Sequence, residues 1–244
     1  MLKKEEIAYF NYSRNENKKF WRRVEEVPNF KNKSVLDFGC GHGALSIDIA
    51  LLGAKFVHGI DLEDKPLEFA NKNLIKNYKH LNNIKFQKLN ILDSNINQKF
   101  DYVVSKDTFE HTNHLPEVLQ KIYNILNVGG RAYLGFGPLY NFYNGDHGRL
   151  NMYLPWFHLL FKEKFLINRI NKKENLNIKT IQDLGLSKYS FAEYKNFFKN
   201  SSFRILFFKT NLSDNPISFV FNALSKIKIF EEFCTYNIYC ILEK

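Results

Sequence analysis

Three glycines, Gly39, Gly41 and Gly43, stand at alternate positions directly after the short apolar segment 34–38. Glycines at such positions permit positive φ angles and let a ligand approach the backbone closely. In an open parallel sheet, ligands bind beyond the carboxyl ends of the strands, where this loop would lie. Dinucleotide sites and plain tight turns use similar loops, so the glycines alone predict a nucleotide-type site and no particular cofactor.

Two carboxylates add to the chemistry of this loop. Asp37 lies inside the apolar segment, where a dinucleotide site usually has an apolar residue. Its carboxylate could hold a loop amide or reach the ammonium end of a cofactor. Asp61 closes a second apolar segment, 55–61, and is placed to accept hydrogen bonds from both hydroxyls of a ribose. The alternative is that Asp61 only caps the helix that follows.

Alternating strands and helices are expected to position these residues. Strands separated by helices imply right-handed crossovers and a parallel sheet with helices on both faces, so the pattern predicts an α/β, doubly wound fold. The expected strands are 34–38, 55–61, 84–91, 100–105, 131–136, 204–209 and 235–242, and the expected helices are 44–52, 66–77, 115–126 and 191–199.

The alternation is interrupted once, and this interruption divides the predicted single domain of residues 1–244. Residues 1–30 are expected to form a helical lid, and 31–138 the cofactor-binding core. Residues 139–190 lack the alternation and are expected to form an insertion over the carboxyl edge of the sheet, on the substrate side. Residues 191–244 are expected to close the fold, with an amphipathic segment at 216–233.

The motifs, taken in order, resemble those of class I, Rossmann-like S-adenosylmethionine-dependent methyltransferases. Segment 35–43 resembles the first motif, 59–62 the ribose-binding acidic motif, and 89–91 the adenine-edge motif, where Asn90 stands in place of the usual Asp. The resemblance covers about residues 30–138 and 190–244. It extends to the fourth-strand motif at 100–105 and 109–111, the turn at 127–131, and the closing elements at 191–203 and 236–244.

This resemblance implies a seven-stranded, mostly parallel sheet with an antiparallel last strand, and S-adenosyl-L-methionine as the cofactor. No metal is expected. The residues expected to bind the cofactor are Asp37, Phe38, Gly39, Cys40, Gly41, Gly43, Asp61, Leu62, Asn90, Ile91 and Lys106.

Histidines after the fourth and fifth strands are the candidate general bases. A sugar or alkyl hydroxyl is a poor nucleophile and benefits from a base, whereas a carboxylate acceptor needs none. His111 and His147 are the expected catalytic residues, and His114 and His158 are weaker candidates. Each has a structural alternative, such as a hydrogen-bonded loop histidine. Aromatic residues that could wall an acceptor pocket are Tyr140, Phe142, Tyr143, Tyr153, Trp156 and Phe157, and Tyr9, Tyr12 and Trp21 could cover the cofactor.

Charge and composition limit the function classes. The formal net charge is +10, yet the chain has no run of four or more basic residues, so no nucleic-acid partner is expected. No apolar stretch reaches the roughly 18 residues needed to span a bilayer. Three unpaired cysteines and an N-terminus without an apolar run fit a protein of the reducing cytoplasm.

The leading hypothesis is methylation of a small molecule, with oxygen as the acceptor atom. A sugar, a nucleotide-linked sugar or a precursor of a bacterial surface polysaccharide is the expected acceptor, and the protein is expected to be a monomer or a homodimer. Alternatives are an RNA or protein methyltransferase, a non-catalytic S-adenosylmethionine-binding protein and, more remotely, a nicotinamide oxidoreductase. Ser105 and Lys106 stand where an amine-methylating motif would follow the fourth strand, which argues against base N-methylation.

Overall fold

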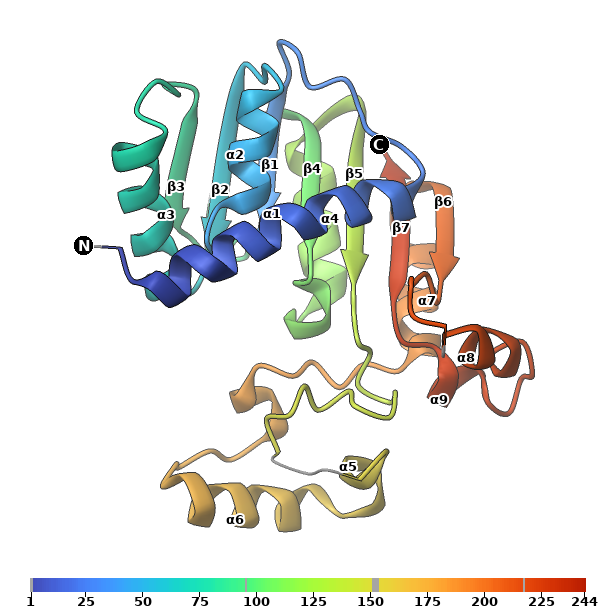
Figure 1. Cartoon of the computed structure of the whole chain (residues 1–244). Coiled ribbons are helices and arrows are strands. Elements are labelled where there is room, and N and C mark those ends of the chain that lie inside the picture. The colour runs from blue at the N-terminus through green and yellow to red at the C-terminus, as the bar shows by residue number, and fades with distance from the viewer. Residues whose placement is uncertain (1, 95, 151–153, 217) are drawn as a thin grey trace.

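Seven strands form one sheet in the order β3-β2-β1-β4-β5-β7-β6 (Figure 1). β1 pairs in parallel with β2 and β4, whereas β7 runs antiparallel to β5 and β6. The predicted α/β fold, with a mostly parallel seven-stranded sheet and an antiparallel last strand, is therefore confirmed. The strands are β1 Ser34–Phe38, β2 Phe56–Asp61, β3 Ile84–Lys88, β4 Phe100–Lys106, β5 Leu126–Phe136, β6 Arg204–Thr210 and β7 Ile238–Glu243.

The structure, a computed structural model, describes residues 2–94, 96–150, 154–216 and 218–244. The strand order reverses between β1 and β4, because the chain moves outward from β1 to β3 and then returns to the other side of β1. Ligands of open α/β sheets bind beyond the carboxyl ends of strands at such a reversal. The sheet therefore directs attention to the loops after β1 and β4.

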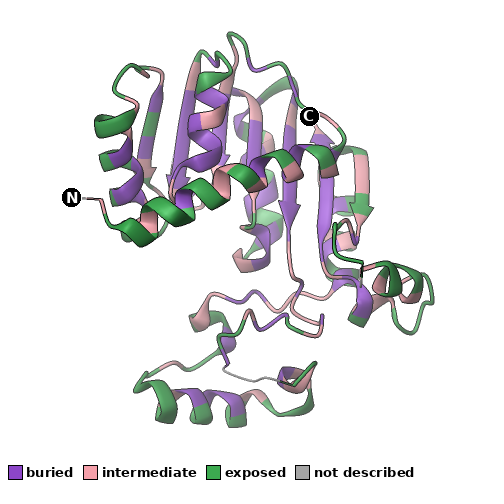
Figure 2. Ribbon diagram, viewed as in Figure 1, coloured by how far each residue is buried: buried purple, intermediate pink, exposed green. Residues whose placement is uncertain are grey.

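Three helices cover one face of the sheet: α1 Lys4–Val24, α2 Ala44–Leu51 and α3 Asp64–Asn77. α1 crosses this face at a steep angle to the strands and keeps an exposed outer side (Figure 2). Its buried residues include Phe10, Phe20 and Val24, which recur at helical spacing and so form one apolar stripe. Within the predicted lid segment, residues 4–24 are therefore one long helix, and residues 25–33 connect it to β1.

The opposite face is covered by α4 Leu115–Ile125 and α7 Phe191–Asn200. The start of α7 carries a capping box, in which Ser190 and Glu193 satisfy each other's backbone amides. Phe198, on α7, is fully buried against this face. Successive apolar residues of a strand point to opposite faces of the sheet, so they pack into two cores, one on each side.

Residues 139–150 and 154–190 follow β5 and form a lower lobe beyond the carboxyl ends of β1 to β5 (Figure 1). It has its own small core, formed by Leu150, Leu166, Ile167, Ile181 and Leu186. The remaining helices are η1 Phe109–His111 after β4, α5 Phe157–Leu160, α6 Glu163–Glu174 and η2 Ile181–Leu184 in this lobe, and α8 Ser218–Leu224 and α9 Glu231–Cys234 before β7.

Some predicted boundaries differ from the structure. The third strand ends at Lys88, three residues early, so Asn90 and Ile91 lie in the turn that follows. β5 begins at Leu126 because its first residues pair with β4 before the expected start at 131. Within the described ranges, no helix combines the length and apolar character needed to cross a bilayer.

Candidate functional site

A cavity of about 620 Å³ opens at the carboxyl ends of β1, β2, β3 and β4. This volume is typical of small-molecule and cofactor sites, which measure roughly 300–1,000 Å³. The lower lobe contributes Arg149 and Gly185 to its wall, and α1 contributes Tyr9 and Ser13. We call it the larger cavity. Ten of the eleven residues predicted to bind the cofactor line this cavity, and Gly43 does not.

The glycine loop forms one wall of the larger cavity. Gly39, Gly41 and Gly43 all have positive φ angles, of 77°, 49° and 77°. A Cβ added to Gly39 would lie 2.1 Å from the Thr108 hydroxyl oxygen, whereas one on Gly41 would meet nothing within 4 Å. Gly39 is therefore required for packing between the loop and the segment after β4. Gly41 leaves open space on the cavity side, where a ligand can approach the backbone.

Asp61 holds the glycine loop in place. Its Oδ2 accepts a hydrogen bond from the Gly41 amide at 2.7 Å, and its Oδ1 accepts one from the Glu63 amide at 3.0 Å. A carboxylate has about four acceptor sites. Two of these are occupied, so the carboxylate can still accept two hydroxyl groups from the cavity. This arrangement suits a ribose.

Asp37 is buried beneath the loop and does not hold a loop amide. Its Oδ2 accepts a hydrogen bond from the Ser46 hydroxyl at 2.5 Å. Burial raises the pKa of Asp37 to about 6, against the opposing effects of Ser46 and the nearby Lys106. Of the two roles expected for this carboxylate, contact with a positively charged ligand group is the one this geometry leaves open. Such a group would stabilise the ionised form.

Lys106, at the end of β4, ties the N-terminal helix to the cavity. Its Nζ donates to Asn17 Oδ1 at 2.7 Å and to the Ser13 carbonyl at 3.1 Å, both on α1. Burial lowers the pKa of this ammonium group, while Asp107 and Asp37 oppose the shift. Lys106 therefore lines the cavity and also fixes the helix that covers it.

The other predicted cofactor residues surround the glycine loop. Cys40 and Ile91 are buried, whereas Leu62 is 59% exposed at the rim. Phe38 packs edge-on against Phe109, with ring centroids 5.8 Å apart. Asn90 uses its amide within its own turn, because its Nδ2 donates to Asp93 and its Oδ1 accepts from the Leu92 amide. Its role toward an adenine stays a prediction.

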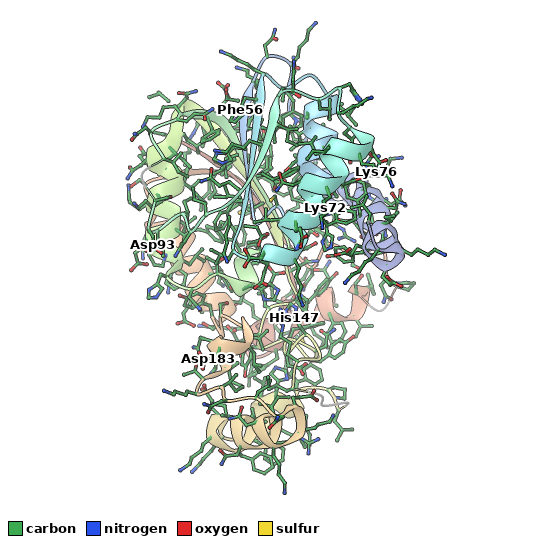
Figure 3. All side chains as sticks on the ribbon, turned by 90° about the vertical axis from the view of Figure 1, so that its left-hand side faces the viewer. Phe56, Lys72, Lys76, Asp93, His147 and Asp183 are labelled. Carbon is green, nitrogen blue, oxygen red and sulfur yellow. The ribbon has the colours of Figure 1, made fainter. Side chains whose placement is uncertain are left out.

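The two predicted catalytic histidines lie together but differ in their access to the cavity. Their ring centroids are 4.8 Å apart, and only His111 lines the larger cavity. His111 Nδ1 donates to the Gly185 carbonyl at 2.5 Å, which leaves Nε2 as a free acceptor. His147 instead bonds through Nε2 to the Pro138 carbonyl at 2.9 Å. Figure 3 shows His147 where the sheet meets the lower lobe.

Burial lowers the pKa of both histidines, and that of His111 falls to about 4. Both rings are therefore neutral at pH 7, as a base must be. His114 also lines the larger cavity, while His158 is buried and bonds to the Tyr140 carbonyl. Among the described residues, no group of three or more His, Cys, Asp or Glu side chains is arranged to hold a metal ion.

The three α1 residues predicted to cover the cofactor lie in different environments. Tyr9 reaches the larger cavity and packs against the His42 ring at 4.7 Å. Tyr12 is exposed. Trp21 is 8% exposed in the core beside Phe30, so its predicted covering role is wrong. The helical stripe that buries α1 against the sheet directs Trp21 inward.

A second cavity, of about 260 Å³, lies beside the first, and we call it the smaller cavity. Of the aromatic residues predicted to wall an acceptor pocket, Phe142 and Tyr143 line it. Trp156 does not line the smaller cavity but packs edge-on against Tyr143, which does. Tyr140 packs against His158 and Phe157 against Phe161, and Tyr153 lies outside the described residues.

Asp107 is the residue that the sequence analysis missed. It follows β4 directly, has a φ of 56°, and lines both cavities. A non-glycine residue held at a positive φ is uncommon and often marks a functional site. The only sequence signal was its place after a strand that ends at the reversal of strand order. Strand position alone does not reveal a left-handed backbone conformation.

Comparison with known proteins agrees with this geometry. Residues 29–135 match the family described as "Methyltransferase domain". A ribosomal protein L11 methyltransferase from Fusobacterium nucleatum is 44% identical over 82 residues, which are 34% of this chain and 26% of that protein. A ubiquinone biosynthesis O-methyltransferase from Dechloromonas aromatica is 30% identical over 113 residues, which are 46% of this chain and 47% of that protein.

The chain thus spans less than half the length of these two curated relatives. Among solved structures, an S-adenosylmethionine-dependent methyltransferase from Mesorhizobium loti superposes with a TM-score of 0.59 at 14% identity. That alignment covers 92% of this chain and 97% of the other. At this identity the likeness establishes the shared fold.

Proposed function

We propose that this protein is a class I, Rossmann-like, S-adenosylmethionine-dependent methyltransferase that methylates an oxygen atom of a small molecule, since residues 29–135 match a methyltransferase domain. The acceptor we propose is a sugar, a nucleotide-linked sugar or a precursor of a surface polysaccharide. A cytoplasmic location and a monomeric or homodimeric state are part of the same prediction.

The larger cavity is the observation that carries this proposal. Its size, the space left on the cavity side of Gly41, and the two free acceptor sites of Asp61 fit an adenosine with a ribose. The buried Asp37 carboxylate fits the ammonium end of S-adenosylmethionine. When bound, this cofactor supplies a methyl group already activated by a sulfonium.

The chain's own residues then have to align the acceptor and exclude water. Lys106 holds α1 against the cavity, and Arg149 from the lower lobe also lines it. His111 presents a free Nε2 to the cavity and can accept a proton from a hydroxyl group. A base is useful for a hydroxyl acceptor, which is why these features favour oxygen methylation.

Charge supports a small acceptor over a nucleic acid. Nucleic-acid sites present basic faces that contact phosphates. The wall of the larger cavity instead carries more carboxylates than cations, with Asp37, Asp61, Glu63 and Asp107 against Lys106 and Arg149. Methylation of a protein is the second candidate, and the identity to the L11 methyltransferase favours it.

Radiolabelled methyl transfer from S-adenosylmethionine separates these candidates. The purified chain would be offered monosaccharides, nucleotide-linked sugars, ribosomal protein and RNA in parallel. We expect label on a sugar hydroxyl and none on the macromolecules. Label on protein alone would replace the proposed acceptor, and tight S-adenosylhomocysteine binding without transfer to any acceptor would support a non-catalytic binding protein.

A further inference from the structure

The smaller cavity meets the larger one at a single residue. Among the described residues that line the two cavities, only Asp107 belongs to both. The smaller cavity lies beyond β5, around Gly137 and Pro138, and is closed by α1 on one side and by the segment that includes α8 on the other. A ligand in the smaller cavity would therefore face the larger cavity across the Asp107 carboxylate.

The size and walls of the smaller cavity suit one ring. Its volume of about 260 Å³ falls below the range of roughly 300–1,000 Å³ typical of pockets for drug-sized ligands. Tyr143 and Phe221 stack with ring centroids 5.7 Å apart and planes 19° apart, and Phe142 lies beside both. Asn144 adds a polar side chain to the same wall, whereas the Asn237 amide is hydrogen-bonded to the Leu212 backbone. Aromatic faces with an amide suit a ring that carries hydroxyl groups.

Arg23 gives the smaller cavity a positive charge. Its Nη1 donates to the Tyr239 hydroxyl at 2.9 Å, and its Nη2 lies 3.8 Å from an exposed Asp214 carboxylate. Its Nε is buried and has no hydrogen-bond partner among the described residues. The Arg23 side chain lines the smaller cavity, so its positive charge would stabilise an anionic ligand group there. A guanidinium pairs well with a planar carboxylate.

Asp107 can act as a base at the junction. None of the described residues donates a hydrogen bond to its carboxylate, which is open to both cavities. The surrounding protein raises the pKa of Asp107, against the opposing effects of Lys106 and Arg23. The titratable groups that interact with it are Tyr9, Glu16 and Arg23 on α1, Lys106 on β4, Glu110 on η1 and Tyr239 on β7.

We propose that the smaller cavity is the acceptor subsite, that it takes a single hydroxyl-bearing ring with an anionic group, and that Asp107 is the general base. This inference rests on the proposed function. The anionic group pairs with Arg23, and any larger group attached to the ring extends outside. The acceptor oxygen bonds to the methyl carbon, the carbon–sulfur bond breaks with its electron pair passing to sulfur, and the hydroxyl proton passes to Asp107.

Binding of single-ring probes tests the subsite without catalysis. The probes are D-glucuronate and 3,4-dihydroxybenzoate, which are anionic, and D-glucose, which is neutral, each titrated by NMR into protein saturated with S-adenosylhomocysteine. We expect at least one anionic ring to bind at least tenfold more tightly than glucose. The stronger anionic probe indicates whether the ring is a sugar or a phenol. Equal binding of all three, or no binding, overturns the inference.

Two variants and one control test whether the probe binds in the smaller cavity. Arg23→Gln should weaken the anionic ring at least tenfold, while Arg22→Gln, which changes an exposed neighbour paired with Asp214, should leave it unchanged. Ser213→Trp fills the smaller cavity from its exposed rim and should abolish probe binding with little effect on S-adenosylhomocysteine. Unchanged probe binding in both Arg23→Gln and Ser213→Trp would place the acceptor elsewhere.

Turnover of the natural acceptor class tests the base. Asp107→Asn should lower kcat by roughly 10²–10⁴-fold and remove the loss of rate at acidic pH, while the anionic ring probe binds at least as tightly as it does to the wild type, because a negative charge beside it is removed. Retained turnover with an unchanged pH profile would overturn the role of Asp107. If wild-type protein fails to bind S-adenosylhomocysteine, the proposed function itself has failed. If S-adenosylhomocysteine binds normally but probe binding is unchanged in Arg23→Gln and Ser213→Trp, only the proposed acceptor subsite is wrong.

Discussion

Replacing Asp61 with asparagine should sharply weaken cofactor binding. The carboxylate accepts the Gly41 and Glu63 amides through different oxygens, at 2.7 Å and 3.0 Å. Asparagine has one oxygen and one NH2 group, so one backbone amide would face a donor, and so would one ribose hydroxyl. A hydrogen bond to a charged group contributes about 1.5–3 kcal/mol. At 1.4 kcal/mol per tenfold, losing one such bond to the ligand weakens binding roughly 10- to 150-fold.

Isothermal titration with S-adenosylhomocysteine measures this effect. Asp64→Asn is the matched control, because it removes the same charge three residues away, where an exposed carboxylate pairs with Lys88. The control should bind as the wild type does, and thermal melts of both variants would show whether the fold is kept. If Asp61→Asn binds within threefold of the wild type, the ribose role of Asp61 is wrong.

Other expected outcomes concern packing and the histidines. Gly39→Ala forces a Cβ into Thr108 at a φ of 77°, so S-adenosylhomocysteine titration should show at least tenfold weaker binding. His111→Ala should lower kcat more than cofactor affinity if His111 is the base, whereas near-normal turnover in His111→Ala together with a large loss in Asp107→Asn would assign the hydroxyl proton to Asp107. His147→Ala should change kcat less than His111→Ala, because His147 lines neither cavity. Because the pKa of folded His111 is lowered to about 4, the unfolded chain binds an extra proton below pH 6.5, so stability falls from about pH 6.5 to 4. Urea melts should show a shallower fall in His111→Gln. Phe198→Ala should cost about 3–5 kcal/mol of stability in the same melts, since the ring is fully buried.

Much of the fold follows from local patterns. Apolar runs that end in glycine or aspartate locate β1 and β2, and Gly39 and Asp61 then fall at the carboxyl edge because parallel strands share that edge. The antiparallel β7 was expected from the family resemblance, since strand direction depends on connections that periodicity does not record. The early end of β3 reflects a turn closed by the Asn90 side chain, which propensity does not predict.

The acceptor side was harder to predict because its residues are distant in the sequence. Arg23, Asp107, Tyr143 and Phe221 come from α1, the end of β4, the lower lobe and α8, and they meet only after the sheet is assembled. Trp21 illustrates the same difficulty, since its covering role depended on which side of α1 faces the sheet. A motif of adjacent residues could not have identified this cavity.

Burial also changes which group is the better base. In water a histidine, with a pKa of about 6.5, is far more basic than an aspartate at about 3.9, which is why the sequence favoured His111. Desolvation disfavours the charged form of either group, so it lowers the pKa of a histidine and raises that of a carboxylate. In the structure, the pKa of His111 falls to about 4 and that of Asp107 rises. The advantage of the histidine is thereby reduced. Asp107 is the base we propose because its carboxylate lines both cavities and accepts no hydrogen bond from the described residues, and a loss of turnover in His111→Ala that is absent from Asp107→Asn would favour His111 instead.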